Sequence, residues 1–347
     1  MTDDLLYVGC YTAEAGGEGS GVACCVRDGV RLREVAVAVT PSPSYLVADP
    51  AAALLFAVNE TPQGAVSSFA IGPSGSLRQL STSPTGGDHP CHLVLHSGQV
   101  LAANYTSGSV SVHPVGPDGD LGLRTDLVRH EGRGPNHDRQ EAPHAHQVRV
   151  AHDGVVTVID LGIDRLVHYR LDSGRLIRCG ETVLPPGCGP RHAAIDHRGR
   201  WYVAGEMDST VVVCARAGDS GRLTVYGRHP TTTSTVDDDN LPSAVVLSTD
   251  GRYLYVANRG ADTIATFAVS EAGVLAPVAE VPCGGEWPRD CSVVGGLLFV
   301  ANQHSHTVTA FRLDPETGVP HPAGTVMEVG SPACVLPLYL GAGYRYR

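Results

Sequence analysis

One phrase recurs along nearly the whole chain and constrains its fold more than any other feature. Each copy runs from a proline or histidine through an apolar run, a Gly or Asp turn, a second apolar run that ends in Ala-Asn or a similar pair, and a Ser/Thr-Val segment. The copies begin at Pro43, Pro90, His144, Pro190, Pro242, Pro288 and, in a truncated form, Pro332. Neighbouring copies start 44 to 54 residues apart, which is the length of a four-stranded propeller blade and too long for a leucine-rich repeat.

The repeat predicts an all-β chain that forms one seven-bladed β-propeller domain over residues 1–347. Short runs of alternating or β-branched residues separated by DG, SG and GG pairs indicate strands joined by hairpins. The copy at Pro332 is too short for a blade, and the apolar run at residues 5–9 has no strand before it. We therefore expect the two ends of the chain to share one blade, which hides the sheet edges. Eight blades are the alternative count.

The composition of the chain restricts the partners that it can bind and the cellular compartment in which we expect it. The formal net charge of −11 disfavours binding to nucleic acid or to anionic membranes, and no apolar stretch is long enough to span a bilayer. The N-terminus carries no secretory signal pattern, so we expect a cytoplasmic protein. The ten cysteines are scattered, without a CxxC pair, and are expected to be reduced packing residues. Oligomeric state is left open.

Unusual polar residues fall at equivalent points of different copies. In a propeller, the start of each blade's first strand and the end of its second strand border one mouth of the central channel. The candidate substrate-binding and catalytic residues at these points are Glu60, Asn104, His144, His146, Arg191, His192, Glu206, Arg259, Arg289 and Asn302. We predict that they gather at this mouth.

Three of these residues are arginines, and their proximity needs an explanation. Arg191, Arg259 and Arg289 would repel one another unless an anion lay among them, because a guanidinium stays charged and a desolvated charge needs a partner. A phosphate or carboxylate of a small substrate is the expected occupant. The alternative is that the arginines pair with acidic residues of neighbouring blades as structural struts.

His146 is the candidate acid or base, since an imidazole can take a proton from water and return it to a leaving alkoxide. His144 could serve instead or orient it. Glu206 could orient His146, accept a proton, bind a sugar hydroxyl, or form a salt bridge to an arginine. The histidines include no complete metal-ligand set, so neither a metal nor another cofactor is expected.

The longest step between copies contains a polar, turn-rich insertion at residues 131–143. A loop this long on a tight scaffold is often functional, although a solvated surface excursion is the plainer interpretation.

Several segments match a known family pattern: residues 7–12 (YVGCYT), 134–146 (GPNHDRQEAPHAH), 160–165 (DLGIDR), 189–192 (GPRH) and 250–260 (DGRYLYVANRG). In these segments the chain resembles the lactonase-type seven-bladed propellers, which include propeller-type 6-phosphogluconolactonases and carboxy-cis,cis-muconate cyclases. The resemblance covers the chain from Tyr7 to the last blade.

The resemblance implies a metal-free site in the channel mouth. It places the family's acid/base histidine on His146, its substrate arginines on Arg191 and Arg259, and its glutamate on Glu206. The implied activity is hydrolysis of a small anionic sugar lactone, with 6-phosphogluconolactone as the expected substrate. A muconate-type cycloisomerase and a non-catalytic protein-binding propeller are the alternatives.

Overall fold

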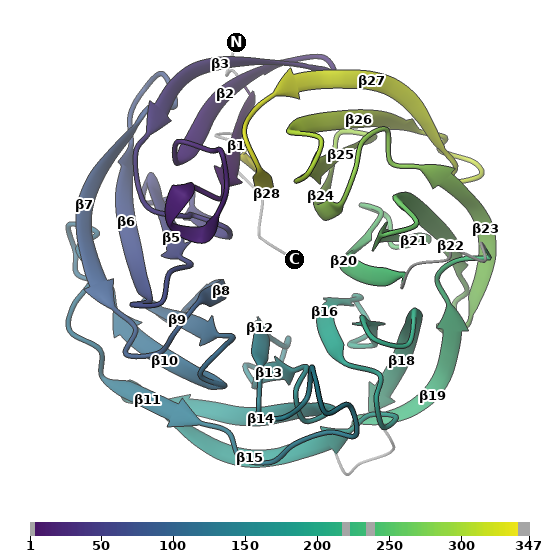
Figure 1. The fold of residues 1–347 in the computed structure, drawn as a ribbon, viewed down its shortest axis with the longest axis horizontal. Coiled ribbons are helices and arrows are strands. Elements are labelled where there is room, and N and C mark those ends of the chain that lie inside the picture. The colour runs from purple at the N-terminus through teal and green to yellow at the C-terminus, as the bar shows by residue number, and fades with distance from the viewer. Residues whose placement is uncertain (1–3, 217–222, 234–239, 339–347) are drawn as a thin grey trace.

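The computed structural model describes residues 4–216, 223–233 and 240–338, and these form seven four-stranded antiparallel sheets arranged as blades around a central axis (Figure 1). The predicted seven-bladed propeller is confirmed. The strands of each sheet are given from the axis outwards. The sheet that joins the two ends of the chain contains β28 (Pro332–Leu338), β1 (Asp4–Cys10), β2 (Val22–Asp28) and β3 (Arg31–Ala38). The next two sheets contain β4 (Leu46–Asp49), β5 (Leu54–Asn59), β6 (Ala65–Ile71) and β7 (Leu77–Pro84), and then β8 (Pro90–His96), β9 (Gln99–Asn104), β10 (Ser109–Pro114) and β11 (Asp126–Arg129). The fourth and fifth contain β12 (Ala145–Val150), β13 (Val156–Asp160), β14 (Arg165–Asp172) and β15 (Arg175–Val183), and then β16 (Pro190–Ile195), β17 (Trp201–Gly205), β18 (Thr210–Arg216) and β19 (Leu223–Pro230). The last two contain β20 (Leu241–Leu247), β21 (Tyr253–Arg259), β22 (Thr263–Val269) and β23 (Leu275–Pro282), and then β24 (Pro288–Val294), β25 (Leu297–Asn302), β26 (Thr307–Leu313) and β27 (Pro320–Glu328). A short 3-10 turn, η1 (Ala13–Ala15), follows β1.

Burial explains why the strands differ in sequence pattern. The second strand of each blade is covered on both faces by neighbouring blades and is almost wholly apolar, as in β5 (LLFAVN) and β25 (LLFVAN), where every residue is buried. The outermost strands have one face in solvent, and in β3 most residues are exposed or half-buried. The position of a strand within its blade therefore decides its composition.

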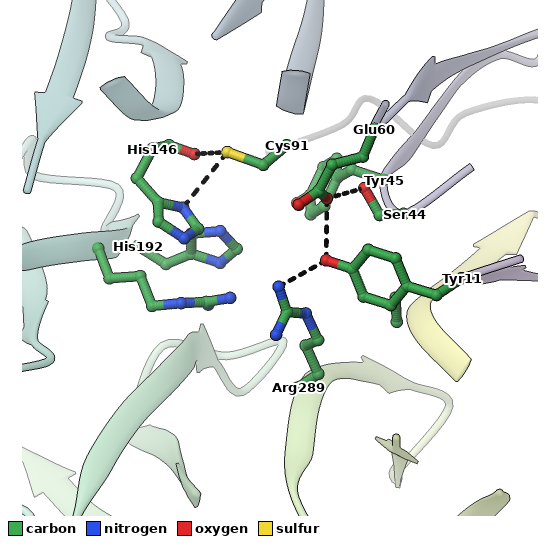
Figure 2. Close-up of a pocket in the computed structure, with 10 residues that line it drawn as sticks. Tyr11, Ser44, Tyr45, Glu60, Cys91, His146, His192 and Arg289 are labelled. Carbon is green, nitrogen blue, oxygen red and sulfur yellow. Dashed lines mark hydrogen bonds between the residues drawn. The ribbon is translucent and has the colours of Figure 1, made fainter. Parts of the chain in front are cut away.

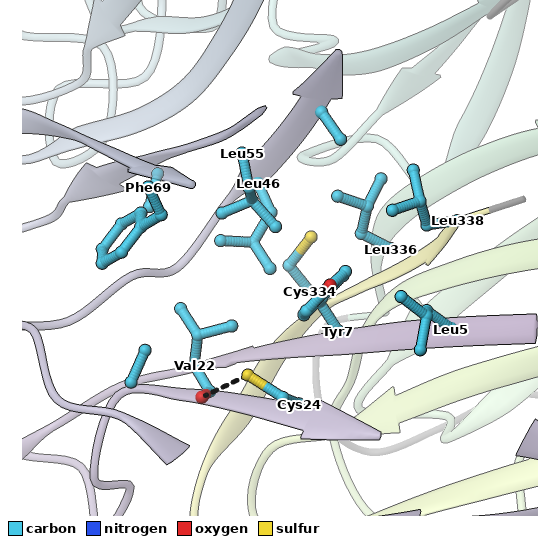
Figure 3. Packing of buried hydrophobic residues seen from close by; sticks show 13 residues of the cluster. Leu5, Tyr7, Val22, Cys24, Leu46, Leu55, Phe69, Cys334, Leu336 and Leu338 are labelled. Atoms are coloured by element: carbon cyan, nitrogen blue, oxygen red, sulfur yellow. Dashed lines mark hydrogen bonds between the residues drawn. The ribbon is translucent and has the colours of Figure 1, made fainter. Parts of the chain in front are cut away.

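The two ends of the chain close the ring. β1 lies between β2 and β28, and its ladder with β28 extends from Leu5 opposite Leu338 to Cys10 opposite Pro332. The shared blade packs its apolar face against the next blade, where Leu5, Tyr7, Val22, Leu336 and Leu338 meet Leu46, Leu55 and Phe69 (Figure 3). Sequence-distant ends thus contribute to one continuous core.

Shortening a buried side chain of the closing strand is expected to destabilise the whole ring. Leu336 is 7% exposed, and Leu336→Ala should lower the free energy of unfolding by about 2–4 kcal/mol because it leaves a cavity between two blades. Urea denaturation followed by circular dichroism measures this change. Leu123, which is 87% exposed, is the control, and Leu123→Ala should leave the unfolding midpoint unchanged. Equal midpoints for the two variants would contradict a stabilising role for closure.

Candidate active site

The innermost strands carry a repeated irregularity that directs side chains toward the axis. In six of them the ladder to the second strand slips near the start, just after the first or second residue. A β-bulge of this kind leaves its extra residue unpaired and re-aims the side chain. The residues left unpaired are Cys91, His146, Arg191, His192, Ser243, Ala244, Arg289 and Ala333. All but Ser243 and Ala244 line one pocket.

This pocket lies at the centre of the ring, and its lining residues come from β-strands that are far apart in sequence (Figure 2). Its empty volume, including the part that is open to solvent, is about 240 Å³. The lining is Tyr11, Ser44, Tyr45, Glu60, Cys91, His146, Arg191, His192, Arg289 and Ala333.

Beside the pocket, Glu206 holds three guanidinium groups together. Its Oε2 lies 2.7 Å from Arg259 Nη2 and 3.2 Å from Arg191 Nε, and its Oε1 lies 2.6 Å from Arg139 Nη2. Burial alone would raise the pKa of this carboxyl group, but Arg259 and Arg191 outweigh it and hold the pKa well below its usual range. Glu206 is therefore an anion that neutralises the arginines, and it is a poor proton acceptor.

The arginines remain charged despite their burial. Burial, followed by the nearby Arg259, lowers the pKa of Arg191 to about 10, which still leaves it protonated at neutral pH. Nε of Arg191 is ion-paired with Glu206 without a well-aligned hydrogen bond, and Nη1 is buried without a hydrogen-bond acceptor in the described part of the chain. Arg191 lines the pocket and has donors to spare, so it suits an oxygen-rich ligand.

His146 is buried beside these charges and is neutral near pH 7. Burial lowers its pKa well below the usual value, and Arg191 lowers it further, whereas Glu206 acts in the opposite direction. Its Nδ1 lies 3.8 Å from Cys91 Sγ, and its ring meets that of His192 edge to face with the ring centres 5.2 Å apart. Because burial also raises the pKa of the Cys91 thiol, Cys91 stays protonated beside a neutral imidazole.

Arg289 approaches the pocket from the opposite side and is paired differently. It has no carboxylate partner: Nη2 donates to the Tyr11 hydroxyl at 2.5 Å and Nη1 to Gln303 Oε1 at 3.3 Å. Tyr11 donates in turn to Glu60 Oε2 at 2.9 Å, and Ser44 donates to the same oxygen (Figure 2). Neutral groups thus orient Arg289 and leave its charge available to a ligand anion.

Most of the predicted site residues do come together. Glu60, His146, Arg191, His192 and Arg289 line the pocket, and Glu206 with Arg259 forms the adjoining ion-pair cluster. The strut interpretation applies to Arg259, which pairs with Glu206 of the neighbouring blade. Arg191 pairs with Glu206 of its own blade, and the strut interpretation does not apply to Arg289.

Three predicted substrate contacts lie elsewhere. Asn104 and Asn302 do not line the pocket, because their side chains turn into their own blades and donate to Ser109 Oγ at 3.1 Å and Thr309 Oγ1 at 3.0 Å. His144 stacks on Tyr105 with ring centres 4.6 Å apart and lies 3.2 Å from Glu141 through Nε2, behind the pocket wall. These three residues support the site from outside it.

Residues that the sequence reasoning did not assign also belong here. Tyr11 follows Cys10, which pairs with Pro332 as Asn258 pairs with Pro242, and its backbone N–H donates to Ser331 as that of Glu60 donates to Ser42. The closing blade therefore places Tyr11 where other blades place Glu60 and Arg259. The shared terminal blade, which was predicted from the sequence, could therefore have been used to predict the position of Tyr11. Arg139 belongs to the insertion. Its guanidinium group donates to Glu206 and lies 3.4 Å from the Tyr105 hydroxyl.

The described part of the chain contains neither a metal-binding cluster nor a membrane-spanning helix. Over residues 4–216, 223–233 and 240–338, no group of three or more His, Cys, Asp or Glu side chains is placed to hold a metal ion. In the same part of the chain, no helix has the length and apolar character that a bilayer span requires.

Comparisons with known proteins agree with this architecture. Residues 5–337 match the family model described as "Lactonase, 7-bladed beta-propeller". The chain belongs to this lactonase family. It is 34% identical over 348 residues to the 6-phosphogluconolactonase of Bacillus subtilis, with 96% of this chain and 98% of the relative covered.

Solved structures of the lactonase family share the same fold. A putative 6-phosphogluconolactonase from Bacteroides fragilis superposes with a TM-score of 0.90 at 29% identity, covering 97% of this chain and 98% of that one. The periplasmic gluconolactonase of Pseudomonas aeruginosa superposes with a TM-score of 0.88 at 32% identity, covering 97% and 99% of the two chains.

Neutralising Glu206 is expected to destabilise the folded protein in a pH-dependent way. Glu206→Gln leaves Arg191 and Arg259 buried without a countercharge, which should cost about 3–5 kcal/mol of unfolding free energy at pH 7. Because the folded pKa is depressed, the carboxylate's contribution is present above its unfolded pKa of about 4.3 and is lost as the pH falls toward the folded value. The deficit of the variant should therefore shrink below pH 4.

Denaturant titrations of both proteins from pH 3 to pH 8 measure this deficit. The exposed Glu271 provides the control, because its side chain has no ion pair and Glu271→Gln should match the parent protein at every pH. A deficit for Glu206→Gln that is independent of pH would show that the ionised carboxylate is not what stabilises the cluster.

Proposed function

We propose that the protein is a 6-phosphogluconolactonase, which hydrolyses the lactone to 6-phosphogluconate. The observation that carries the proposal is a neutral imidazole, His146, beside the buried Arg191, which has unused donors, in one pocket. The Bacillus subtilis relative has this name and matches nearly the whole chain. The site offers what lactone hydrolysis needs: a base, donors for an oxyanion and a cation for the substrate's phosphate.

In the proposed reaction His146 acts as the base and then as the acid. It takes a proton from a water molecule, and the water oxygen forms a bond to the lactone carbonyl carbon. Arg191, which has unused donors, stabilises the oxyanion of the tetrahedral intermediate. When the carbon bond to the ring oxygen breaks, the imidazolium returns the proton to the leaving alkoxide, and the product is an open-chain carboxylic acid.

The other charged residues position this machinery. Arg289, held by Tyr11 and Gln303, binds the phosphate. Arg259 and Glu206 fix the orientation of Arg191, and Arg139 closes the cluster from the insertion. Glu206 is not the base, because three guanidinium groups stabilise its ionised form.

The cysteines support a reducing compartment. All ten are free and nine of them are buried, so no disulfide stabilises the fold. We propose a cytoplasmic location on this ground.

Removing the imidazole is expected to abolish most of the activity. His146→Ala should lower kcat for freshly prepared 6-phosphogluconolactone by about 100- to 10,000-fold, the usual contribution of a general base. The rate is measured by acid release after subtraction of spontaneous ring opening, with and without a chelator. The parent protein should be unaffected by the chelator.

His321, which is exposed on β27, is the matched control, and His321→Ala should keep the parental rate. Parental turnover by His146→Ala would remove His146 from the mechanism. A parent protein that opens no lactone but interconverts a carboxymuconate and its lactone would replace the proposal with a cycloisomerase.

Arg289 is expected to set the preference for a phosphorylated substrate. Arg289→Ala should lower kcat/KM for 6-phosphogluconolactone by about 10- to 100-fold, because a charge-assisted contact to the phosphate is lost. The rate with unphosphorylated gluconolactone should change little. Arg312→Ala, which removes an exposed arginine from β26, should change neither substrate's rate. Equal losses for both lactones would assign Arg289 to the reacting carbonyl instead of the phosphate.

A further inference from the structure

A second, larger groove lies on the outer side of the ring, between β11 and the strands β14 and β15 in the lower part of Figure 1. β11 has four residues, whereas the outermost strands of the other six sheets have eight or nine. The short strand leaves room beside β14 and β15. The empty volume, including the part open to solvent, is about 1100 Å³.

The charges that line this groove are mostly positive. Four arginines, Arg129, Arg133, Arg165 and Arg178, face two glutamates in a protein whose net charge is −11. Arg165 and Arg178 both pair with Glu181, whereas the side chains of Arg129 and Arg133 form no hydrogen bond or ion pair with any residue that the structure describes. Two unpaired guanidinium groups at one rim favour a phosphorylated ligand.

The floor of the groove is apolar and aromatic. It is formed by Val128, Ile163, Val167, Tyr169 and Leu176. The ring of His130 lies parallel to that of Tyr169, with an interplanar angle of 9° and ring centres 6.1 Å apart. A flat, weakly polar ring is the ligand group that such a floor accommodates.

His130 adds a buried polar atom with no partner. Its side chain is 3% exposed, and its Nδ1 lies 2.6 Å from Asp160 Oδ2. A carboxylate only accepts, so Nδ1 of His130 carries a proton. Nε2 is buried and has no hydrogen-bond partner in the described part of the chain. It can bond a polar group of a ligand, such as a ring nitrogen or the amino group of a nucleobase.

We propose that this groove binds a nucleotide, with the base on the His130–Tyr169 floor and the phosphates at Arg129 and Arg133, and that the bound nucleotide restrains the start of β12. The second part rests on Asp160. Its Oδ2 accepts from His130, and its Oδ1 accepts from the backbone N–H of His144 at 2.8 Å. β12, which carries His146, begins one residue later. A ligand on His130 is thus two hydrogen bonds from the strand of the catalytic base.

Isothermal titration calorimetry of the full chain with ATP, ADP and AMP tests the binding. The paired change Arg129→Ala/Arg133→Ala should weaken the bound nucleotide at least about tenfold, because charged contacts to phosphate are lost. Arg31→Ala/Arg33→Ala removes the same charge from exposed positions of β3 and should leave the affinity unchanged. His130→Phe keeps a ring on Tyr169 but no ring nitrogen, and should weaken binding about three- to tenfold.

Absence of nucleotide binding overturns the proposal, and so does equal weakening by the two double-arginine variants. Adenosine and inorganic phosphate are titrated separately; if phosphate alone binds as tightly as AMP, the base-binding floor is wrong. Hydrogen exchange of residues 144–148 tests the link to β12, and should slow with nucleotide in the parent protein but not in Arg129→Ala/Arg133→Ala. Unchanged exchange in the parent overturns that link. None of these readouts depends on lactone hydrolysis, so the proposed activity can fail independently.

Discussion

The buried carboxylate of Glu206 is the interaction on which the rest of the site depends. Arg139, Arg191 and Arg259 converge on it from three different parts of the chain, and without it their charges would be desolvated and mutually repulsive. With it, the cluster keeps one guanidinium, Arg191, fixed at the pocket with donors unused. Arg289 is held separately through neutral groups. The propeller can therefore concentrate positive charge at its axis although the whole protein is acidic.

The scaffold makes this concentration possible by repetition. Each blade brings the start of its innermost strand to the axis, and in six of the seven blades a bulge there re-aims one or two side chains. The bulged position holds Cys91, His146, Arg191 and Arg289 in four different blades. The backbone is nearly the same in each blade, so the chemistry of the site is decided by which side chain each blade presents, and changes there leave the blade cores intact.

The repeat in the sequence was sufficient to predict the seven blades, the shared terminal blade and the gathering of His146, Arg191 and Glu206 at one mouth, because spacing fixes equivalent positions in a cyclic repeat. Spacing does not fix which way a side chain turns. Asn104 and Asn302 were expected at the pocket, but their side-chain N–H groups donate to hydroxyl groups within their own blades. The pairing of Arg139 with Glu206 could not be predicted either, because an irregular loop carries no periodicity. Whether each arginine contacts a ligand or joins two blades as a strut could be decided only from the structure. Arg259 is a strut and Arg289 is not.

The balance of charge around His146 links substrate binding to basicity. In the free site burial and the arginines depress the pKa of His146, which keeps the ring neutral but makes it a weak base. A phosphorylated substrate places negative charge near Arg289, and this charge offsets the arginines' effect on the imidazole. The pKa of His146 then rises toward the solution pH, where a general base is most effective, and the imidazolium formed during water attack is stabilised. In the proposed mechanism, the anion bound by the arginines would thus also make His146 a stronger base, whereas a neutral lactone bound in the same pocket would meet a weaker one.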